Sequence, residues 1–169
     1  MSAGNAQEGL SAPRRTVLAS KISHQVDLVD LRVTHLSTDL LQVPQLSPLR
    51  IGAKHELSWE HGEGALQYFV NFTLEVAEPE TSDPDSEAEA ADVPVFTSRM
   101  TLSVVYDFDG DPEDDDVYLA FGELSVMHTV YPYLRELVHT LTVRAGLPPL
   151  VMPSFLSPVL NDESEPAED

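Results

Sequence analysis

The carboxylates that follow the apolar run Val104–Tyr106 come nearest to the spacing of a reactive site. Asp107 and Asp109 stand two residues apart and are followed by Gly110. A carboxylate directly after a strand can attack phosphorus, and a second one beside it can transfer a proton next to a magnesium ion. The pair therefore suggests one possible reaction, the hydrolysis of a phosphate ester. The rest of the sequence must then contain the other residues that this reaction needs.

This Asp-x-Asp-Gly segment resembles the nucleophile motif of haloacid-dehalogenase-type phosphatases, which would make Asp107 the nucleophile and Asp109 the acid/base. That chemistry also needs a lysine further along the chain, whereas the last lysine here is Lys54. Only 62 residues follow Asp107, too few for the doubly wound sheet that carries the rest of such a site. A metal-dependent phosphatase is therefore the minor alternative, and we expect an acidic turn and no enzyme.

The same acidic stretch fails as a calcium loop. Pro112 stands where such a loop needs glycine, and Tyr118 stands where it needs a bidentate glutamate. The six histidines show no zinc spacing, and the chain has no cysteine. The sequence therefore predicts no catalytic residue, no metal site and no cofactor.

The acidic residues are concentrated in three segments. The net charge is −20, yet 19 of the 29 acids and none of the nine bases lie in residues 78–92, 107–116 and 161–169. An overall field of this sign repels phosphate backbones and anionic lipid headgroups. We therefore expect neither nucleic acid nor a membrane as a partner, and a nearly neutral folded part with an acidic fringe.

Hydrophobic periodicity divides the chain into strands and then helices. Alternating or extended patterns predict four strands, at residues 26–36, 51–59, 66–77 and 96–106. A period near 3.6 predicts two helices, at residues 117–127 and 132–145, the second with Pro132 in its first turn and Gly146 just past its end. Strands followed by helices indicate an α+β protein with an antiparallel sheet.

The composition also predicts the organisation into segments. We expect a flexible amino-terminal arm over residues 1–23, with room for a short helix around Arg14–Ser23. One domain would span residues 24–160, with an acidic disordered insert at 78–92, and residues 161–169 would be an acidic disordered tail. Because no apolar leader or membrane-length run is found, we expect a cytoplasmic protein.

The segment Leu147–Leu160 is dense in hydrophobic residues, yet its four prolines exclude a helix or a central strand. One interpretation is a loop packed over the core. The other is a lid at the edge of an apolar groove, where Met and Phe side chains adapt to varied ligands.

Two motifs around the last predicted helix resemble a known family. Val130–Glu136 reads VYPYLRE, and Gly146–Pro148, where the helix ends, reads GLP. In this order, after four strands, they resemble the bacterial protein-export chaperone SecB and its solitary relatives. The resemblance implies a SecB-like fold, with a four-stranded Greek-key-like sheet and two helices packed on one face. It also implies assembly as a homotetramer, a dimer of dimers.

The resemblance further implies an ATP-independent holdase that binds unfolded polypeptides in apolar grooves during protein export and translocation. Asp30 matches an acidic residue with which the family docks onto the SecA motor. Related alternatives are a dedicated chaperone of an antitoxin in a toxin–antitoxin system, or an adaptor for one folded partner. The predicted client-binding residues are Leu147, Leu150, Met152, Phe155 and Leu156, with Tyr131 and Tyr133 in structural roles.

Overall fold

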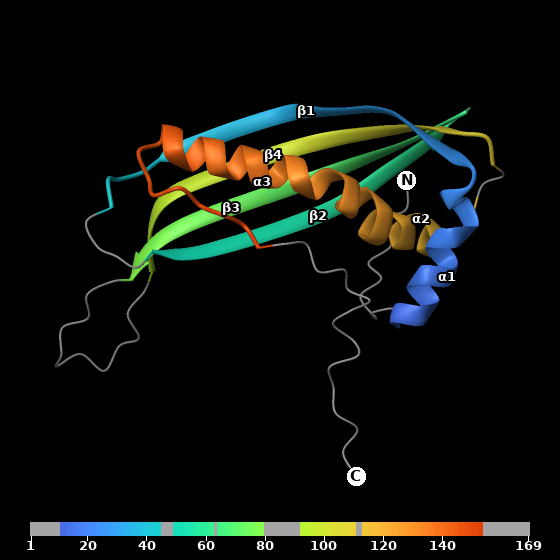
Figure 1. Cartoon of the computed structure of the whole chain (residues 1–169), viewed down its shortest axis with the longest axis horizontal. Helices are drawn as coiled ribbons and strands as arrows, with labels where there is room; N and C mark the ends of the chain where they lie inside the picture. Colours follow the sequence, from blue (N-terminus) through green and yellow to red (C-terminus); the bar gives the residue numbers. More distant parts are fainter. Residues whose placement is uncertain (1–10, 45–48, 63, 80–91, 111–112, 154–169) are drawn as a thin grey trace, which may run out of the picture.

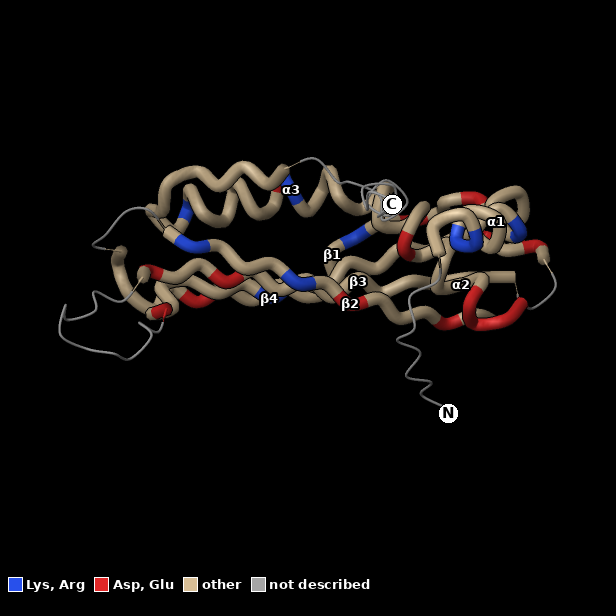
Figure 2. The backbone as a smooth tube through the Cα atoms, turned by 90° about the horizontal axis from the view of Figure 1, so that it is seen from below, with Lys and Arg blue, Asp and Glu red and all other residues tan. Residues whose placement is uncertain are grey.

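The computed structural model describes residues 11–44, 49–62, 64–79, 92–110 and 113–153 (Figure 1). It forms one antiparallel sheet with its helices on one side, as the edge-on view shows for α3 (Figure 2). In chain order the elements are α1 (Ala12–Ser23), β1 (Val26–Leu40), β2 (Arg50–Gly62), β3 (Ala65–Pro79), β4 (Asp92–Phe108), α2 (Asp115–Phe121), the π-helical segment η1 (Gly122–Val126) and α3 (Met127–Arg144).

The strand order is β1-β4-β3-β2, with every neighbouring pair antiparallel. Strands β2, β3 and β4 follow one another as hairpins, and β1 lies beside β4, which is a Greek-key arrangement. The predicted α+β class and the four-stranded antiparallel Greek-key sheet are therefore confirmed. Strands β1 and β2 form the two edges of the sheet.

The two central strands supply most of the core. In β3 the even-numbered positions from Leu66 to Val76 are all buried, and their neighbours in β4 alternate in the same way from Phe96 to Phe108. These side chains face the helices, because successive side chains of a strand point to opposite faces. The alternation predicted from the sequence is therefore the one that builds the core.

Strand β1 departs from the predicted alternation. Its pairing with β4 shifts between Leu28 and Asp30, and again between Val33 and His35. Each β-bulge inserts one unpaired residue and reverses the phase of the strand. As a result Val29 does not share a face with Leu31 and Val33, as the simple alternation predicted. The aliphatic residues opposite the core positions of β4 are Leu28, Leu31, Val33, Leu36 and Leu40.

The prediction that Pro132 lies in the first turn of a helix was wrong. Helical backbone runs from Asp115 through η1 to Arg144, so Pro132 lies inside α3. Proline lacks the N–H that would bond to the carbonyl of His128. Burial of Met127 and Val130 favours helix across this stretch in spite of that loss.

Gly122 stands where the helical segment η1 packs closely on the sheet. A Cβ at this position would lie 3.0 Å from Cε1 of Tyr68. The Tyr68 hydroxyl also donates a buried hydrogen bond of 2.8 Å to the carbonyl of Tyr118. The absence of a side chain at Gly122 therefore lets η1 pack directly on the ring of Tyr68.

The strands next to the expected acidic insert are longer than predicted. Glu78 and Pro79 still belong to β3 and pair with Val93 and Asp92 of β4, so the prediction that the insert covers all of 78–92 was wrong at both ends. Backbone pairing between β3 and β4 extends both strands beyond their alternating apolar residues. Residues 80–91, like the predicted tail at 161–169, lie outside the described part of the chain.

The amino-terminal helix α1 packs against α2. Ile22 and Ala19 are buried, and three ion pairs connect the two regions: Arg14 with Asp116, Arg15 with Glu123 and Lys21 with Glu113, at 3.2 to 3.6 Å. Within the described ranges no helix combines the length and apolar character needed to cross a membrane.

Candidate functional site

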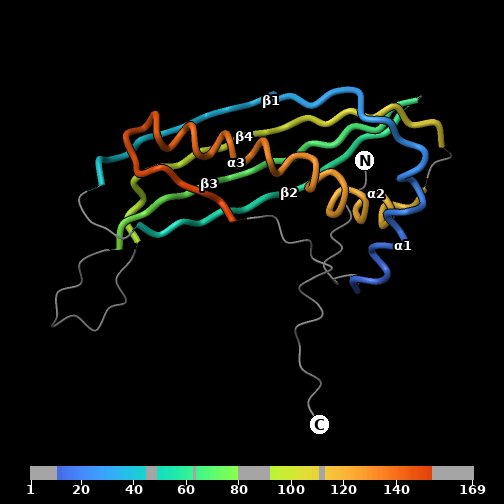
Figure 3. Tube along the Cα trace, in the orientation of Figure 1, coloured from blue at the N-terminus to red at the C-terminus, as the bar shows by residue number. Residues whose placement is uncertain are grey.

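The chain reverses direction after α3 and lies back across the sheet. Gly146 has φ +76°, and two hydrogen bonds of 3.0 Å close the turn: the N–H of Gly146 to Val143 and the N–H of Leu147 to Thr142. This pattern is a Schellman motif, which favours glycine because of the positive φ. Residues 147–153, here called the strap, then run back over β3 toward β2 (Figure 3).

The strap is fixed to the rest of the fold at several points. Leu147 is 6% exposed and Met152 is 8% exposed, and both belong to the hydrophobic core. The N–H of Leu150 donates to the hydroxyl of Thr142 at 3.2 Å, and the Tyr131 hydroxyl donates to the carbonyl of Pro153 at 2.9 Å. Burial raises the pKa of Tyr131, while the charge of nearby Arg135 acts in the opposite direction.

An apolar groove lies between the strap and β2, and we call it the strap groove. Its volume is about 270 Å³. Half of the side chain of Ile51, on its β2 wall, is exposed to solvent. Among the described residues that line it, Thr142 is the one polar residue; the lining consists of Leu49, Ile51, Val76, Thr142, Leu147, Pro148, Pro149 and Leu150. Such a lining suits apolar side chains.

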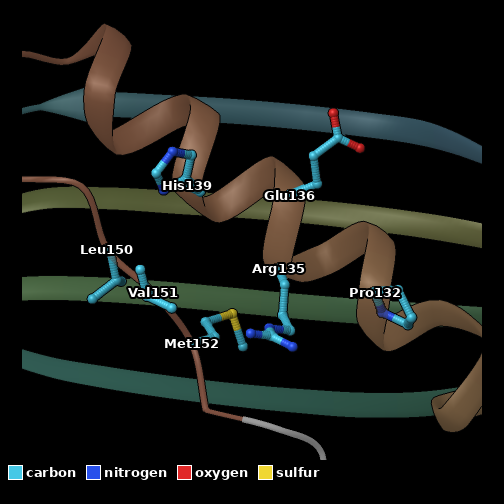
Figure 4. A pocket seen from close by; sticks show the side chains of 7 residues that line it. All are labelled: Pro132, Arg135, Glu136, His139, Leu150, Val151 and Met152. Atoms are coloured by element: carbon cyan, nitrogen blue, oxygen red, sulfur yellow. The ribbon is translucent and has the colours of Figure 1, made fainter.

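A second cavity, the Arg135 cavity, lies between the strap and α3 and has a volume of about 300 Å³. Figure 4 shows Arg135 reaching from α3 toward Met152 on the strap, while the carboxylate of Glu136 points away from the strap. The lining residues are Pro132, Arg135, Glu136, His139, Leu150, Val151 and Met152. Leu150 also lines the strap groove, so the two cavities lie on either side of one residue.

The predicted client-binding residues are only partly brought together. Leu147 and Leu150 line the strap groove, and Leu150 and Met152 line the Arg135 cavity. Phe155 and Leu156 lie outside the described residues. Because Leu147 and Met152 are largely buried, Leu150 is the predicted residue best placed to touch a bound chain.

The sequence reasoning missed the opposite walls of both cavities. Ile51 of β2 carried no signal beyond being an apolar residue of a predicted strand. Arg135 appeared only as part of the VYPYLRE motif. Its position at the border of the apolar stripe that contains Leu134 and Val138, in a chain with few bases, was the available signal.

A row of aliphatic side chains on β1 is also uncovered. Leu28, Val33, Leu36 and Leu40 are between 41% and 52% exposed, although their positions in the sheet point to the helix-covered face. We call these four residues the β1 row. Because β1 is an edge strand, the row lies beside backbone groups that are open to further pairing.

The face of the sheet away from the helices carries the charged candidates. Asp107 lies directly opposite Asp27, and both are exposed. Among the residues that the structure describes, no group of three or more His, Asp or Glu side chains is arranged to hold a metal ion. Asp30 lies on this same face and forms an ion pair of 3.0 Å with Arg32.

No protein-family model matches the chain, and no curated protein matches its sequence. Among solved structures it is similar to the Mycobacterium tuberculosis SecB-like chaperone Rv1957, in complex with a ChAD peptide from the HigA1 antitoxin Rv1956. The TM-score is 0.68 at 17% identity, and the match covers 83% of this chain and 98% of that one. The chain therefore has the α+β fold of the SecB-like chaperones.

Proposed function

We propose that this protein is an ATP-independent chaperone that holds unfolded polypeptides in the strap groove. The observation that carries the proposal is the apolar groove between β2 and the strap on a SecB-like fold. A holdase must bind many sequences through non-directional apolar contact, and the aliphatic lining supplies this. The function needs neither a cofactor nor a catalytic residue.

The charge distribution supports the same role. A protein with open apolar grooves must stay in solution when they are empty, and a net charge of −20 opposes self-association. Most of that charge lies in three segments, and no Asp or Glu stands among the described residues that line the strap groove. Solubility is thus provided without charging the apolar walls.

Suppression of aggregation tests the proposal. A chemically unfolded client is diluted into buffer with or without the protein, and light scattering is followed. We expect the wild type to suppress scattering equally with and without ATP, and Ile51→Asp to lose most of that effect. The control is Val17→Asp, a comparable change at an exposed position of α1.

Two results would count against the proposal in different ways. Full suppression by Ile51→Asp would show that clients bind elsewhere, whereas no suppression by the wild type would rule out a holdase. Phe155→Asp and Leu156→Asp test the remaining predicted contacts in the same assay.

Protein export is the role that we propose first, in the cytoplasm and with SecA as a partner. Asp30 lies on the face of the sheet opposite the strap groove, so a motor and a client could bind at once. We expect Asp30→Lys to weaken SecA binding in a pull-down. The matched control is Asp39→Lys, at an exposed position on the same face of β1.

A dedicated antitoxin chaperone is the second candidate, favoured by the antitoxin peptide in the similar structure. It predicts tight binding of one antitoxin and poor suppression of general aggregation. If the wild-type protein does not bind SecA but prevents aggregation of an antitoxin encoded beside its gene, the antitoxin role is favoured over export.

Assembly as a homotetramer belongs to the same proposal. The β1 row and the open edge of β1 offer a surface that a second copy can cover, through strand pairing and apolar contact. Light scattering coupled to gel filtration should give the mass of a tetramer. Leu36→Asp should lower that mass, whereas Val17→Asp on α1 should not.

A further inference from the structure

We propose that the Arg135 cavity binds an acidic side chain of the client, so that preferred client segments carry an Asp or Glu near an apolar anchor. This inference rests on the proposed function, because the apolar anchor would occupy the strap groove. It adds a polar selectivity to a site that is otherwise apolar.

The state of Arg135 is the first observation behind this proposal. Its side chain is half-buried and reaches toward the strap, where Met152 lies (Figure 4). Within the described ranges, Arg135 forms no ion pair. Five of the other eight bases form ion pairs, namely Arg14, Arg15, Lys21, Arg32 and Arg50. The remaining three, Lys54, Arg99 and Arg144, form none with described residues but are exposed, so Arg135 is the half-buried base among the four without an ion pair in the described part of the chain.

The surroundings of Arg135 favour a carboxylate as its partner. Half-buried Leu150 and buried Met152 lie on the strap side of the cavity, and such apolar surface lowers the local dielectric and strengthens an ion pair. A planar guanidinium matches a carboxylate with two parallel hydrogen bonds. His139 adds a further nitrogen donor or acceptor to the lining, and Glu136 directs its charge away.

The position of Leu150 sets the spacing within the client. This residue lines both cavities, so an apolar side chain in the strap groove leaves the neighbouring residues of a bound segment next to the Arg135 cavity. The expected segment is therefore an apolar residue with an acid within a few positions. Small free anions are weaker candidates, because they bring no apolar anchor to offset the repulsion from the overall charge of −20.

Paired peptides test this selectivity directly. The probes are nine-residue peptides, blocked at both ends, with a Phe-Leu pair and one Glu placed one to four residues away, together with Gln counterparts. Affinities for the full chain are measured by titration calorimetry. We expect the best Glu peptide to bind about tenfold more tightly than its Gln counterpart, as for a hydrogen-bonded charge pair.

Variants of Arg135 test whether this residue is the source of the preference for Glu peptides over Gln peptides. Arg135→Gln should abolish it while leaving the affinity for the Gln peptide nearly unchanged, and Arg135→Lys should retain part of it because the charge remains. Arg99→Gln is the matched control, since Arg99 is exposed on the opposite face of the sheet, and it should keep the full preference. Circular dichroism melting checks that each variant is folded.

The outcomes are distinct. Equal binding of Glu and Gln peptides by the wild type, or an unchanged preference in Arg135→Gln, would overturn the acidic selectivity and leave the holdase intact. If no peptide binds, the proposed function fails and this inference fails with it. A Glu preference that appears only after residues 154–169 are deleted would assign the cavity to the acidic tail, against the proposal.

Discussion

The hydroxyl of Tyr131 donates a hydrogen bond to the carbonyl oxygen of Pro153, at a distance of 2.9 Å. The bond joins α3 to the far end of the strap, whose near end is fixed by Gly146 and Leu147. Both cavities lie along the strap between these points. The strap is therefore held as a wall of the site, with the Tyr131 hydrogen bond and the burial of Met152 fixing its far end.

Tyr131→Phe tests this attachment. We expect a loss of about 1 kcal/mol in the free energy of unfolding, typical of one hydrogen bond, with the fold retained. Amide hydrogen exchange should be faster at Leu150, whose N–H is bonded to Thr142, than in the wild type. Unchanged exchange along the strap would show that the other contacts suffice to hold it.

Tyrosine ionisation should limit stability at alkaline pH. Burial raises the pKa of Tyr68 far above 10, with further contributions from Tyr106 and Tyr118, and burial also raises the pKa of Tyr106. Above pH 10 the unfolded chain loses these protons while the folded chain keeps them. The stabilisation is thus complete below pH 10 and is lost as pH rises toward the folded-state values.

Urea unfolding at pH 9 and pH 11 measures this effect. Each retained proton should lower the free energy of unfolding by about 1.4 kcal/mol per pH unit above 10. Tyr68→Phe should make the decline shallower, at a cost of about 1 kcal/mol at neutral pH for the lost bond to Tyr118. A decline equally steep in the variant would mean that other groups control alkaline unfolding.

Gly122→Val should destabilise the protein by about 2 kcal/mol. The added side chain would press on the ring of Tyr68, which is fully buried and held by its own hydrogen bond, so the ring has little room to move. Gly52→Ala is the control, because its Cβ meets no atom within 4 Å. Thermal or urea unfolding of both variants gives the comparison, and equal stabilities would contradict the close approach of η1 to the sheet.

Asp107→Asn should raise the free energy of unfolding slightly, by about 0.5 kcal/mol at low salt. Asp107 and Asp27 lie directly opposite each other, and like charges in such a pair repel. The gain should shrink at high salt because the two carboxylates are exposed and screened. The phosphatase alternative predicts instead a magnesium-dependent turnover of p-nitrophenyl phosphate that Asp107→Asn abolishes, and we expect none in the wild type.

Local sequence patterns determined most of the architecture. The alternation from Leu66 to Val76 and the 3.6-residue stripe around Leu134 and Val138 identified the core, because side-chain direction follows backbone period. Gly146 marked the end of the last helix, since a positive φ favours glycine. The VYPYLRE and GLP motifs indicated the SecB-like fold.

Only the tertiary structure decided what no local pattern records. The two bulges of β1 assign Leu28 and Leu36 to the helix-side face, because a bulge changes the phase of a strand without a distinctive residue. Burial of Val130 stabilises helical backbone on both sides of Pro132, so the helix begins before this proline. Ile51 and Leu150 line one cavity although they are far apart in sequence, and Arg135 and Met152 line the other although the chain reverses direction between them. The strap could thus be predicted from the sequence, whereas the residues on the opposite walls of the two cavities, Ile51 and Arg135, were identified only in the folded structure.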